Sequence, residues 1–248
     1  MTMTAPDAAT NSSPRRRGGH PIWWGRLLYD LLWVLTRALA VSLLGFRRGR
    51  PGPLPATGGL LVLASHQSHL DPLLLGLATD RRLSSLARSS LFRFGPFGRV
   101  ITALDAIPIN REASTVQAMK TVIGRLREGA AVIVFPEGTR TATGRLGEIK
   151  GGFAVLAKRG RVPIAPVAIV GAYECWPRSR LLPRPGRIRL EFGPVIPAAE
   201  VAALDERQLV ERCSESLQAL DRRARQLRAG CANCTDEADD GMGLNSAG

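Results

Sequence analysis

Short apolar runs alternate with segments of helical periodicity along most of the chain. Five runs predict β-strands, because they are short, mostly aliphatic and bounded by turn residues: 59–64, 83–87, 131–135, 163–170 and 188–192. Strands that alternate with helices are typical of α/β proteins. The sequence therefore predicts an α/β fold, with a mixed, mostly parallel sheet flanked by helices.

One of the intervening helices is marked at both ends. Apolar residues recur every three or four positions between residues 113 and 129, at Val116, Met119, Ile123 and Leu126. Ser114 and Gln117 form a capping box at the start of this segment, and Gly129 follows its last turn. The pattern predicts an amphipathic helix between these signals.

The most hydrophobic long stretch, residues 22–46, does not have the pattern of a simple membrane span. Asp30 and Arg37 interrupt it short of the roughly 20 apolar residues that a bilayer requires. On a helical wheel Arg26, Asp30 and Arg37 lie within about 40° of one another, which leaves a wide apolar face. Trp23 and Trp24 lie at the start of this stretch and arginines follow its end, so we predict an amphipathic, membrane-associated helical segment at residues 21–50, broken into two helices.

Two other interpretations of this stretch stay open. A helix buried in the core would also be apolar, although so wide an apolar face needs a large partner to cover it. A signal peptide would explain the arginines at 15–17 and the Ala-Leu-Ala sequence at 38–40, but the internal charges disfavour it. We expect the segment to be retained.

Length and composition predict one folded domain with two tails. A chain of 248 residues buries one sizeable core. Residues 1–20 lack periodicity and residues 229–248 are acidic, so both are predicted to be disordered tails. The folded domain is then expected to span residues 51–228.

The formal charge of +13 suggests an anionic partner, such as nucleic acid, a phospholipid surface or a phosphorylated substrate. Arginine accounts for 31 of the 34 basic residues, so part of this charge reflects composition. Nucleic-acid surfaces interleave basic and aromatic residues, whereas aromatics are 5% of this chain and five of the thirteen lie between Trp23 and Phe46. We therefore expect no nucleic acid among the partners.

The four cysteines are too few and too irregularly spaced for a disulfide framework, which favours a reducing compartment. Cys231 and Cys234 have the spacing of a metal or redox pair. They lie in the acidic tail without a second pair or a nearby histidine, so we interpret them as two thiols of a solvated tail.

Candidate chemistry begins directly after the first predicted strand, in "SHQSHLD". A histidine whose second nitrogen is held by a carboxylate can take a proton from an alcohol, and His66 and Asp71 are spaced for that contact across a strand-to-helix turn. His66, His69 and Asp71 as metal ligands, or an ordinary helix start with incidental histidines, are the alternatives. No further cluster of candidate ligands is present, so we predict no metal.

Three further stretches add anion-binding chemistry. "FPEGTR" follows the third predicted strand and places Gly138 and Arg140 where backbone amides and a guanidinium can meet a phosphate. Taken alone, this stretch is as readily a structural turn as an anion site. "PINRE" contributes Arg111 before the capped helix, and "IKGG" contributes Lys150 before another amphipathic run.

Together and in this order, these blocks resemble the glycerophospholipid acyltransferases, especially the 1-acyl-sn-glycerol-3-phosphate (lysophosphatidate) acyltransferases. The resemblance covers about residues 60–170 and rests on four blocks: H-x4-D in "SHQSHLD", "PINRE", "FPEGTR" with its following "KGG", and "VPIAPVAI" with Pro163 and Pro166. It implies that residues 51–228 are an acyltransferase domain. The family often has asparagine before the histidine, where this chain has Ser65.

The resemblance also implies roles for individual residues. His66 would be the general base on the sn-2 hydroxyl of lysophosphatidate, and Asp71 would orient it. Arg111 and Arg140 would hold the phosphate, while Glu137, Gly138 and Thr139 would belong to the same binding pocket. His69 does not fit the family pattern, so we expect it to support the site from outside or to be exposed.

The implied reaction needs no cofactor, because acyl-CoA or acyl carrier protein is a co-substrate that donates the acyl group. The implied location is the cytoplasmic face of the cell membrane, with peripheral or monotopic attachment to the phospholipid surface. Two alternatives remain: an acyltransferase for another lyso-phospholipid or lyso-aminolipid, and a non-catalytic lipid-binding member of the fold.

Overall fold

The structure is a computed structural model, and it describes residues 42–49, 54–93, 95, 105–109, 115–180 and 182–230. The predicted N-terminal tail, most of the predicted membrane-associated segment and the C-terminal residues 231–248 lie outside the described residues. So do Arg111, Ser114, Cys231 and Cys234. None of the described helices is long and apolar enough to span a membrane.

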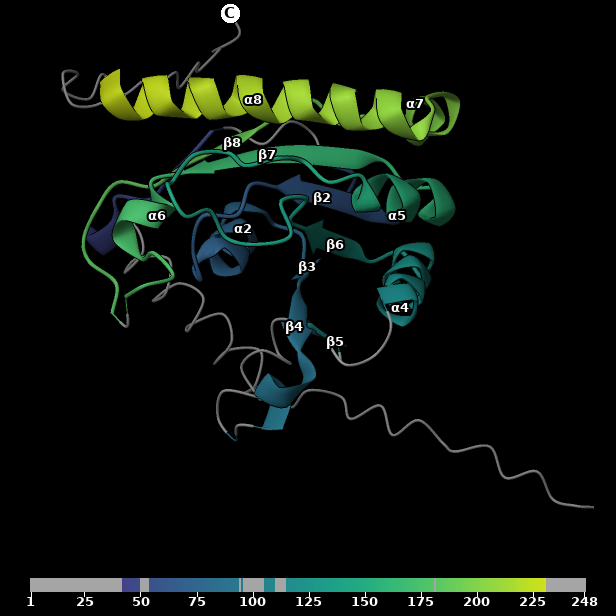
Figure 1. The fold of residues 1–248 in the computed structure, drawn as a ribbon, viewed down its shortest axis with the longest axis horizontal. Helices are drawn as coiled ribbons and strands as arrows, with labels where there is room; N and C mark the ends of the chain where they lie inside the picture. The colour runs from purple at the N-terminus through teal and green to yellow at the C-terminus, as the bar shows by residue number, and fades with distance from the viewer. Residues whose placement is uncertain are drawn as a thin grey trace, which may run out of the picture. The chain divides into compact units, whose positions relative to one another are not determined.

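The described part of the chain contains a six-stranded sheet in the order β1-β8-β7-β2-β6-β3 (Figure 1). Its strands are β1 (Arg47–Arg48), β2 (Leu60–Ala64), β3 (Leu83–Ser84), β6 (Ala131–Val134), β7 (Ile164–Val170) and β8 (Arg189–Phe192). Neighbouring strands run parallel except β7 and β8, which are antiparallel. The predicted α/β fold with a mixed, mostly parallel sheet is thus confirmed.

One predicted strand is divided between two sheets. Residues 83–87 were expected to form a single strand, but β3 pairs with β6 whereas β4 (Leu86–Arg88) pairs with β5 (Ile107–Ile109) in a separate two-stranded sheet. The chain leaves the main sheet at Ser85, whose carbonyl accepts a hydrogen bond from the backbone N–H of Ile107. The local sequence alone cannot show this change of partner, because strand pairing depends on residues that are distant in the chain.

Helices pack around the sheet and around one another. They are α2 (Asp71–Ala78), α4 (Thr115–Arg127), α5 (Gly152–Gly160), α6 (Ala172–Cys175), α7 (Ala198–Ala203) and α8 (Glu206–Gly230), with a 3-10 helix η1 (Ser89–Arg93). The predicted capped helix corresponds to α4, and Gly129 follows it with a φ of 90°. Helix α8 lies along β7 and β8 (Figure 1), and α5 contacts α4, α7 and α8.

The core lies between the central strands and these helices. All residues of β2 and β7 are buried, as expected for parallel strands covered on both faces. Burial on both faces explains why these strands appear in the sequence as continuous apolar runs. The carboxyl ends of parallel strands meet at one edge of a sheet, so the segments after β2, β6 and β7 are brought together there.

Candidate active site

His66 lies in the loop that joins β2 to α2, and its imidazole contacts Asp71 at the start of that helix. The distance from His66 Nδ1 to Asp71 Oδ2 is 2.8 Å. Asp71 is fully buried and the His66 side chain is 20% exposed, so the carboxylate is shielded while part of the imidazole reaches the surface. The structure therefore brings together the two residues predicted to form a catalytic dyad.

Asp71 Oδ2 also accepts hydrogen bonds from the backbone N–H groups of Gln67, at 2.6 Å, and Ser68, at 2.8 Å. Burial raises the pKa of Asp71, while the hydrogen bonds from His66, Ser68 and Gln67 act in the opposite direction. Because the carboxylate accepts from Nδ1, the proton of a neutral imidazole sits on Nδ1 and the lone pair on Nε2. This arrangement suits His66 to act as a base.

Three neighbours of His66 hold the loop in place. Ser65 Oγ accepts a hydrogen bond from the backbone N–H of Ile169 at 2.8 Å. Gln67 Nε2 donates to the carbonyl of Gly144 at 2.9 Å, and Ser68 Oγ donates to the carbonyl of Trp176 at 2.7 Å. All three side chains are buried, so they tie the loop to β7 and to the segments after β6 and β7.

Glu137 of "FPEGTR" connects the loop after β6 to the dyad. Its Oε1 accepts from the backbone N–H of His66 at 2.7 Å, and its Oε2 accepts from the backbone N–H of Gly147 at 2.8 Å. Burial raises the pKa of the Glu137 carboxyl, and these two hydrogen bonds oppose that rise. Both carboxyl oxygens are directed at backbone groups, so Glu137 shapes the site by holding two loops together.

The His66 ring is also fixed by stacking. It lies on Phe135 with ring centroids 3.9 Å apart and an interplanar angle of 14°. The backbone N–H of Thr141 donates to the His66 carbonyl at 2.8 Å. The last residue before "PEGTR" and the first residue after it thus both contact the predicted base.

Arg140 lies next to the dyad and contacts His69 through Nη1 and the imidazole Nε2. Burial lowers the pKa of Arg140, and the neighbouring charge of Arg178 lowers it further. Burial likewise lowers the pKa of His69, with Arg140 and His66 acting in the same direction. His69 is exposed and its ring is tilted against Trp176, with centroids 5.6 Å apart.

The turn that precedes Arg140 is open to solvent. Gly138 and Thr139 are exposed, and Gly138 has a φ of 72°, a left-handed conformation that favours glycine. A Cβ atom at Gly138 would lie 3.4 Å from Nζ of Lys150, so the lysine ammonium is next to this turn. The exposed turn is therefore next to Lys150 and two residues before Arg140, which contacts His69.

Several of these neighbours carry no sequence signal of their own. Gln67 and Ser68 are ordinary polar residues in the sequence, and their contacts with Gly144 and Trp176 form only once β2, β6 and β7 are adjacent. Among the residues the structure describes, no group of three or more histidine, cysteine or carboxylate side chains could hold a metal ion.

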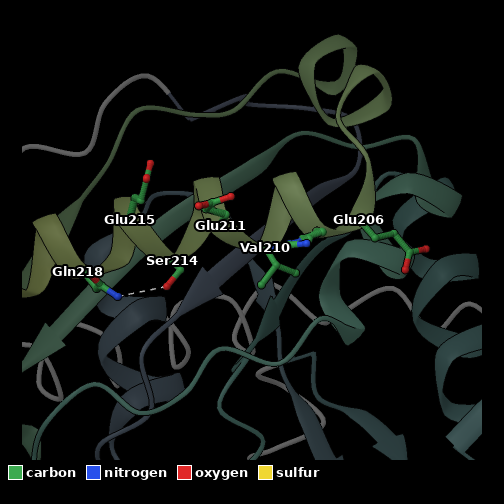
Figure 2. A pocket seen from close by; sticks show the side chains of 7 residues that line it. Glu206, Val210, Glu211, Ser214, Glu215 and Gln218 are labelled. Atoms are coloured by element: carbon green, nitrogen blue, oxygen red, sulfur yellow. Dashed lines mark hydrogen bonds between the residues drawn. The ribbon is translucent and has the colours of Figure 1, made fainter.

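A separate groove runs beside the N-terminal half of α8 (Figure 2). Its lining residues belong to one helix and are Glu206, Arg207, Val210, Glu211, Ser214, Glu215 and Gln218. None of the predicted site residues lines it, and its three glutamates would repel an anionic substrate. The candidate chemistry therefore stays at the carboxyl edge of the sheet.

Comparison with known proteins identifies a family whose model spans the candidate site. The acyltransferase family model matches residues 49–170, which include His66, Asp71 and all of "FPEGTR". The chain is 30% identical over 175 residues to 1-acyl-sn-glycerol-3-phosphate acyltransferase of Bacillus subtilis, which covers 70% of this chain and 83% of the relative.

Two further relatives differ more in length or in sequence. The chain is 28% identical over 160 residues to the human 1-acyl-sn-glycerol-3-phosphate acyltransferase beta. This match covers 63% of this chain and 58% of the human protein. The crystal structure of the LPA acyltransferase PlsC from Thermotoga maritima has a similar fold. It matches with a TM-score of 0.69 and 24% identity over 84% of this chain and 83% of that one.

Proposed function

Because this chain belongs to the glycerophospholipid acyltransferase family, we propose that it acylates the sn-2 hydroxyl of 1-acyl-sn-glycerol-3-phosphate and forms phosphatidate. The acyl donor in this proposal is acyl-CoA or acyl carrier protein. The observation that carries the proposal is the 2.8 Å contact between His66 Nδ1 and Asp71 Oδ2, in a loop held from several sides. A base oriented in this way is what transfer to an alcohol requires.

The proposed reaction runs through His66 Nε2. This nitrogen takes the proton of the acceptor hydroxyl while the hydroxyl oxygen attacks the thioester carbonyl. Asp71 stabilises the imidazolium that forms. Collapse of the tetrahedral intermediate breaks the bond between carbon and sulfur, and the imidazolium returns its proton to the departing thiolate. General-base catalysis of this kind contributes about 10²- to 10⁴-fold.

The acceptor phosphate is proposed to bind beside the dyad. Arg140 is the principal ligand in this proposal because its guanidinium can contact two phosphate oxygens. The exposed turn at Gly138 and Thr139 directly precedes Arg140, and the ammonium of Lys150 is next to this turn. Arg111 completes the site in this proposal, on the basis of its place in the family motif. A phosphate held here would leave the glycerol hydroxyl free to approach His66.

Both substrates carry long acyl chains, so we propose that the protein works at the cytoplasmic face of the cell membrane, attached peripherally or monotopically. The part of residues 21–50 that precedes β1 would provide the attachment, since its wide apolar face suits a bilayer surface. Arg47 and Arg48 belong to the sheet instead, as β1. A site at the interface would also exclude water from the thioester.

Transfer of a radiolabelled acyl group to lysophosphatidate in detergent or vesicles tests this function. We expect labelled phosphatidate with the wild type, loss of at least about 10²-fold with His66→Ala, and a higher acceptor KM with Arg140→Ala. Arg207→Ala, at an exposed position of α8, is the matched control for loss of an arginine. Both acyl-CoA and acyl carrier protein are supplied as donors.

Each of the other results points to a different conclusion. Transfer to another lysolipid but not to lysophosphatidate would replace the proposed acceptor. Full activity of His66→Ala would contradict the mechanism. Failure with every lysolipid and both donors would favour a non-catalytic lipid-binding protein.

A further inference from the structure

His69 lies in the same loop as His66 but has no part in the proposed reaction. It is exposed, and it does not belong to the family pattern. Its imidazole Nε2 contacts Nη1 of Arg140, the principal phosphate ligand of the proposed site. A titratable group therefore lies against the guanidinium that is assigned to the acceptor phosphate.

The contact with Arg140 indicates the protonation state of His69. A guanidinium only donates hydrogen bonds, so Nε2 of His69 accepts and the proton of the neutral imidazole is on Nδ1. Burial lowers the pKa of His69, and the charges of Arg140 and His66 lower it further, whereas Asp71 acts in the opposite direction. The imidazole is therefore mainly neutral at neutral pH, and added negative charge would favour a proton on Nε2.

The charged groups that act on His69 in the described part of the chain come from two loops. Arg140 belongs to the loop after β6, while His66 and Asp71 belong to the loop and helix start around His69. Burial lowers the pKa of Arg140, and the positive charge of Arg178, in the segment after α6, lowers it further. Asp71 is fully buried, so an anion that enters from the surface meets the cationic and titratable groups first.

The ring of His69 is held beside Trp176, which is itself fixed at two points. The ring centroids are 5.6 Å apart, with an interplanar angle of 47°. The carbonyl of Trp176 accepts from Ser68 Oγ at 2.7 Å, and its indole Nε1 donates to the carbonyl of Arg180 at 3.0 Å. The imidazole thus has a defined position next to Arg140, although its side chain is exposed.

We propose that His69 is a ligand of the acceptor phosphate and shares a proton with a phosphate monoester, so that this chain prefers lysophosphatidate to lysolipids whose phosphate is a diester. This inference rests on the proposed function. A phosphate that enters between the two side chains takes over the hydrogen bond from Arg140 Nη1. One proton then lies between a phosphate oxygen and Nε2 of His69.

Monoesters and diesters differ in the proton that they can carry. A phosphate monoester has a second ionisation at a pH of about 6, so near neutral pH it exchanges a proton readily with a base. Either the phosphate hydroxyl donates to neutral Nε2, or protonated Nε2 donates to the dianion in a charge-assisted hydrogen bond. A diester has no second ionisation. With a diester, His69 would have to take its proton from solvent, against the effects of burial and of Arg140.

The substitution His69→Gln separates proton sharing from the positioning of Arg140. The amide oxygen of glutamine can still accept from the guanidinium, but the amide does not titrate. We expect the KM of lysophosphatidate to rise about fivefold with kcat little changed, because a neutral hydrogen bond replaces a charge-assisted one. The kinetics with lysophosphatidylglycerol, a diester, should stay unchanged. Ser179→Ala, at an exposed position near Trp176, is the control and should alter neither acceptor.

Binding of sn-glycerol 3-phosphate, measured by calorimetry in two buffers of different ionisation enthalpy, gives a readout that needs no turnover. At a pH of about 8 the free phosphate is mainly a dianion, so the wild type should take up close to one proton for each molecule bound. Because the complex holds the additional proton, affinity should fall as the pH rises from about 7 to 9. His69→Gln should lose both the proton uptake and this dependence on pH.

Three results would overturn the role of His69. They are an equal change in the kinetics of both acceptor classes, a variant that keeps the proton uptake, and a wild type that takes up no proton or does not bind sn-glycerol 3-phosphate. Proton uptake that depends on His69, without acyl transfer to any lysolipid, would contradict the proposed function alone. Acyl transfer to lysophosphatidate that His69→Gln leaves unchanged would contradict the role of His69 alone.

Discussion

At the scale of single residues, Asp71 is the most constrained group in the candidate site. Three N–H groups donate to its Oδ2, whereas its Oδ1 is buried without a partner in the described part of the chain. An asparagine can place its carbonyl oxygen at the Oδ2 position and keep the three hydrogen bonds. Its amide nitrogen would occupy the Oδ1 position. Asp71→Asn therefore removes the negative charge and keeps the shape of the side chain.

Asp71→Asn is therefore expected to keep the fold and lose activity. Without the carboxylate charge the imidazolium is not stabilised, and we expect kcat to fall by about 10²-fold or more. Burial raises the pKa of Asp71, so wild-type activity should decline on acidification at a higher pH than an exposed aspartate would cause. The variant has no carboxyl group at this position. The decline in activity that protonation of Asp71 causes at low pH should therefore be absent from its pH profile.

Initial rates as a function of pH, together with urea unfolding, check both expectations. Unfolding free energies of variant and wild type should agree within about 1 kcal/mol. A variant with nearly wild-type kcat would show that the carboxylate is dispensable for catalysis. A variant that does not fold would show that the Asp71 carboxylate is required for the structure.

Ser65 shows how the site accommodates a departure from the family pattern. Its hydroxyl accepts from the Ile169 N–H at 2.8 Å, and its backbone N–H donates to the Val167 carbonyl at 3.2 Å. A short polar side chain thus anchors the start of the loop to β7. The chain has an internal partner for the serine at the place where relatives often have asparagine.

At the scale of elements, α8 covers β7 and β8 with a narrow apolar stripe (Figure 1). Its buried residues are Leu209, Cys213, Leu217, Leu220 and Ala224. Burial raises the pKa of the Cys213 thiol to about 12, so this cysteine remains protonated within the core. The helix therefore belongs to the core although most of its residues are polar.

Leu217→Ala should destabilise the protein by about 2–5 kcal/mol, because it removes a fully buried side chain and leaves a cavity. Leu227 is on the same helix and is 39% exposed, so Leu227→Ala is the matched control and should change stability by about 0.5 kcal/mol or less. Urea unfolding followed by circular dichroism measures both. Equal effects of the two substitutions would mean that α8 does not pack on the sheet as described.

At the scale of the whole molecule, the formal charge of +13 dominates long-range behaviour. An excess of this size attracts anionic surfaces before any specific contact forms. Both substrates in the proposed reaction carry phosphate, so the same field would favour their approach. The field adds to binding at specific sites and does not replace it.

The charge predicts salt-dependent binding to anionic membranes. We expect the protein to sediment with phosphatidylglycerol vesicles more than with phosphatidylcholine vesicles in dilute buffer. The difference should shrink at about 1 M salt, where the Debye length falls to about 3 Å. Binding that remains at high salt would measure the contribution of apolar contacts. Equal binding to both vesicles in dilute buffer would contradict a role for charge.

The predictions from sequence were most accurate where one local pattern decides the outcome. The apolar runs at 60–64, 131–134 and 164–170 become buried parallel strands, since burial on both faces requires continuous apolar residues. Helix α8 is not among the elements predicted from the sequence, because its apolar stripe is spread thinly among charged residues. The split of residues 83–87 was also missed, since strand pairing depends on distant residues.

The sequence by itself determined the α/β class and the family and predicted the contact of His66 with Asp71, because these depend on local periodicity, on short motifs and on residues five positions apart. Only the tertiary structure decided what surrounds them. Glu137, Ser65 and Gln67 hold the loop through partners that are distant in the sequence. Contacts between distant segments follow from how strands pair and helices pack, and no local pattern of residues specifies them.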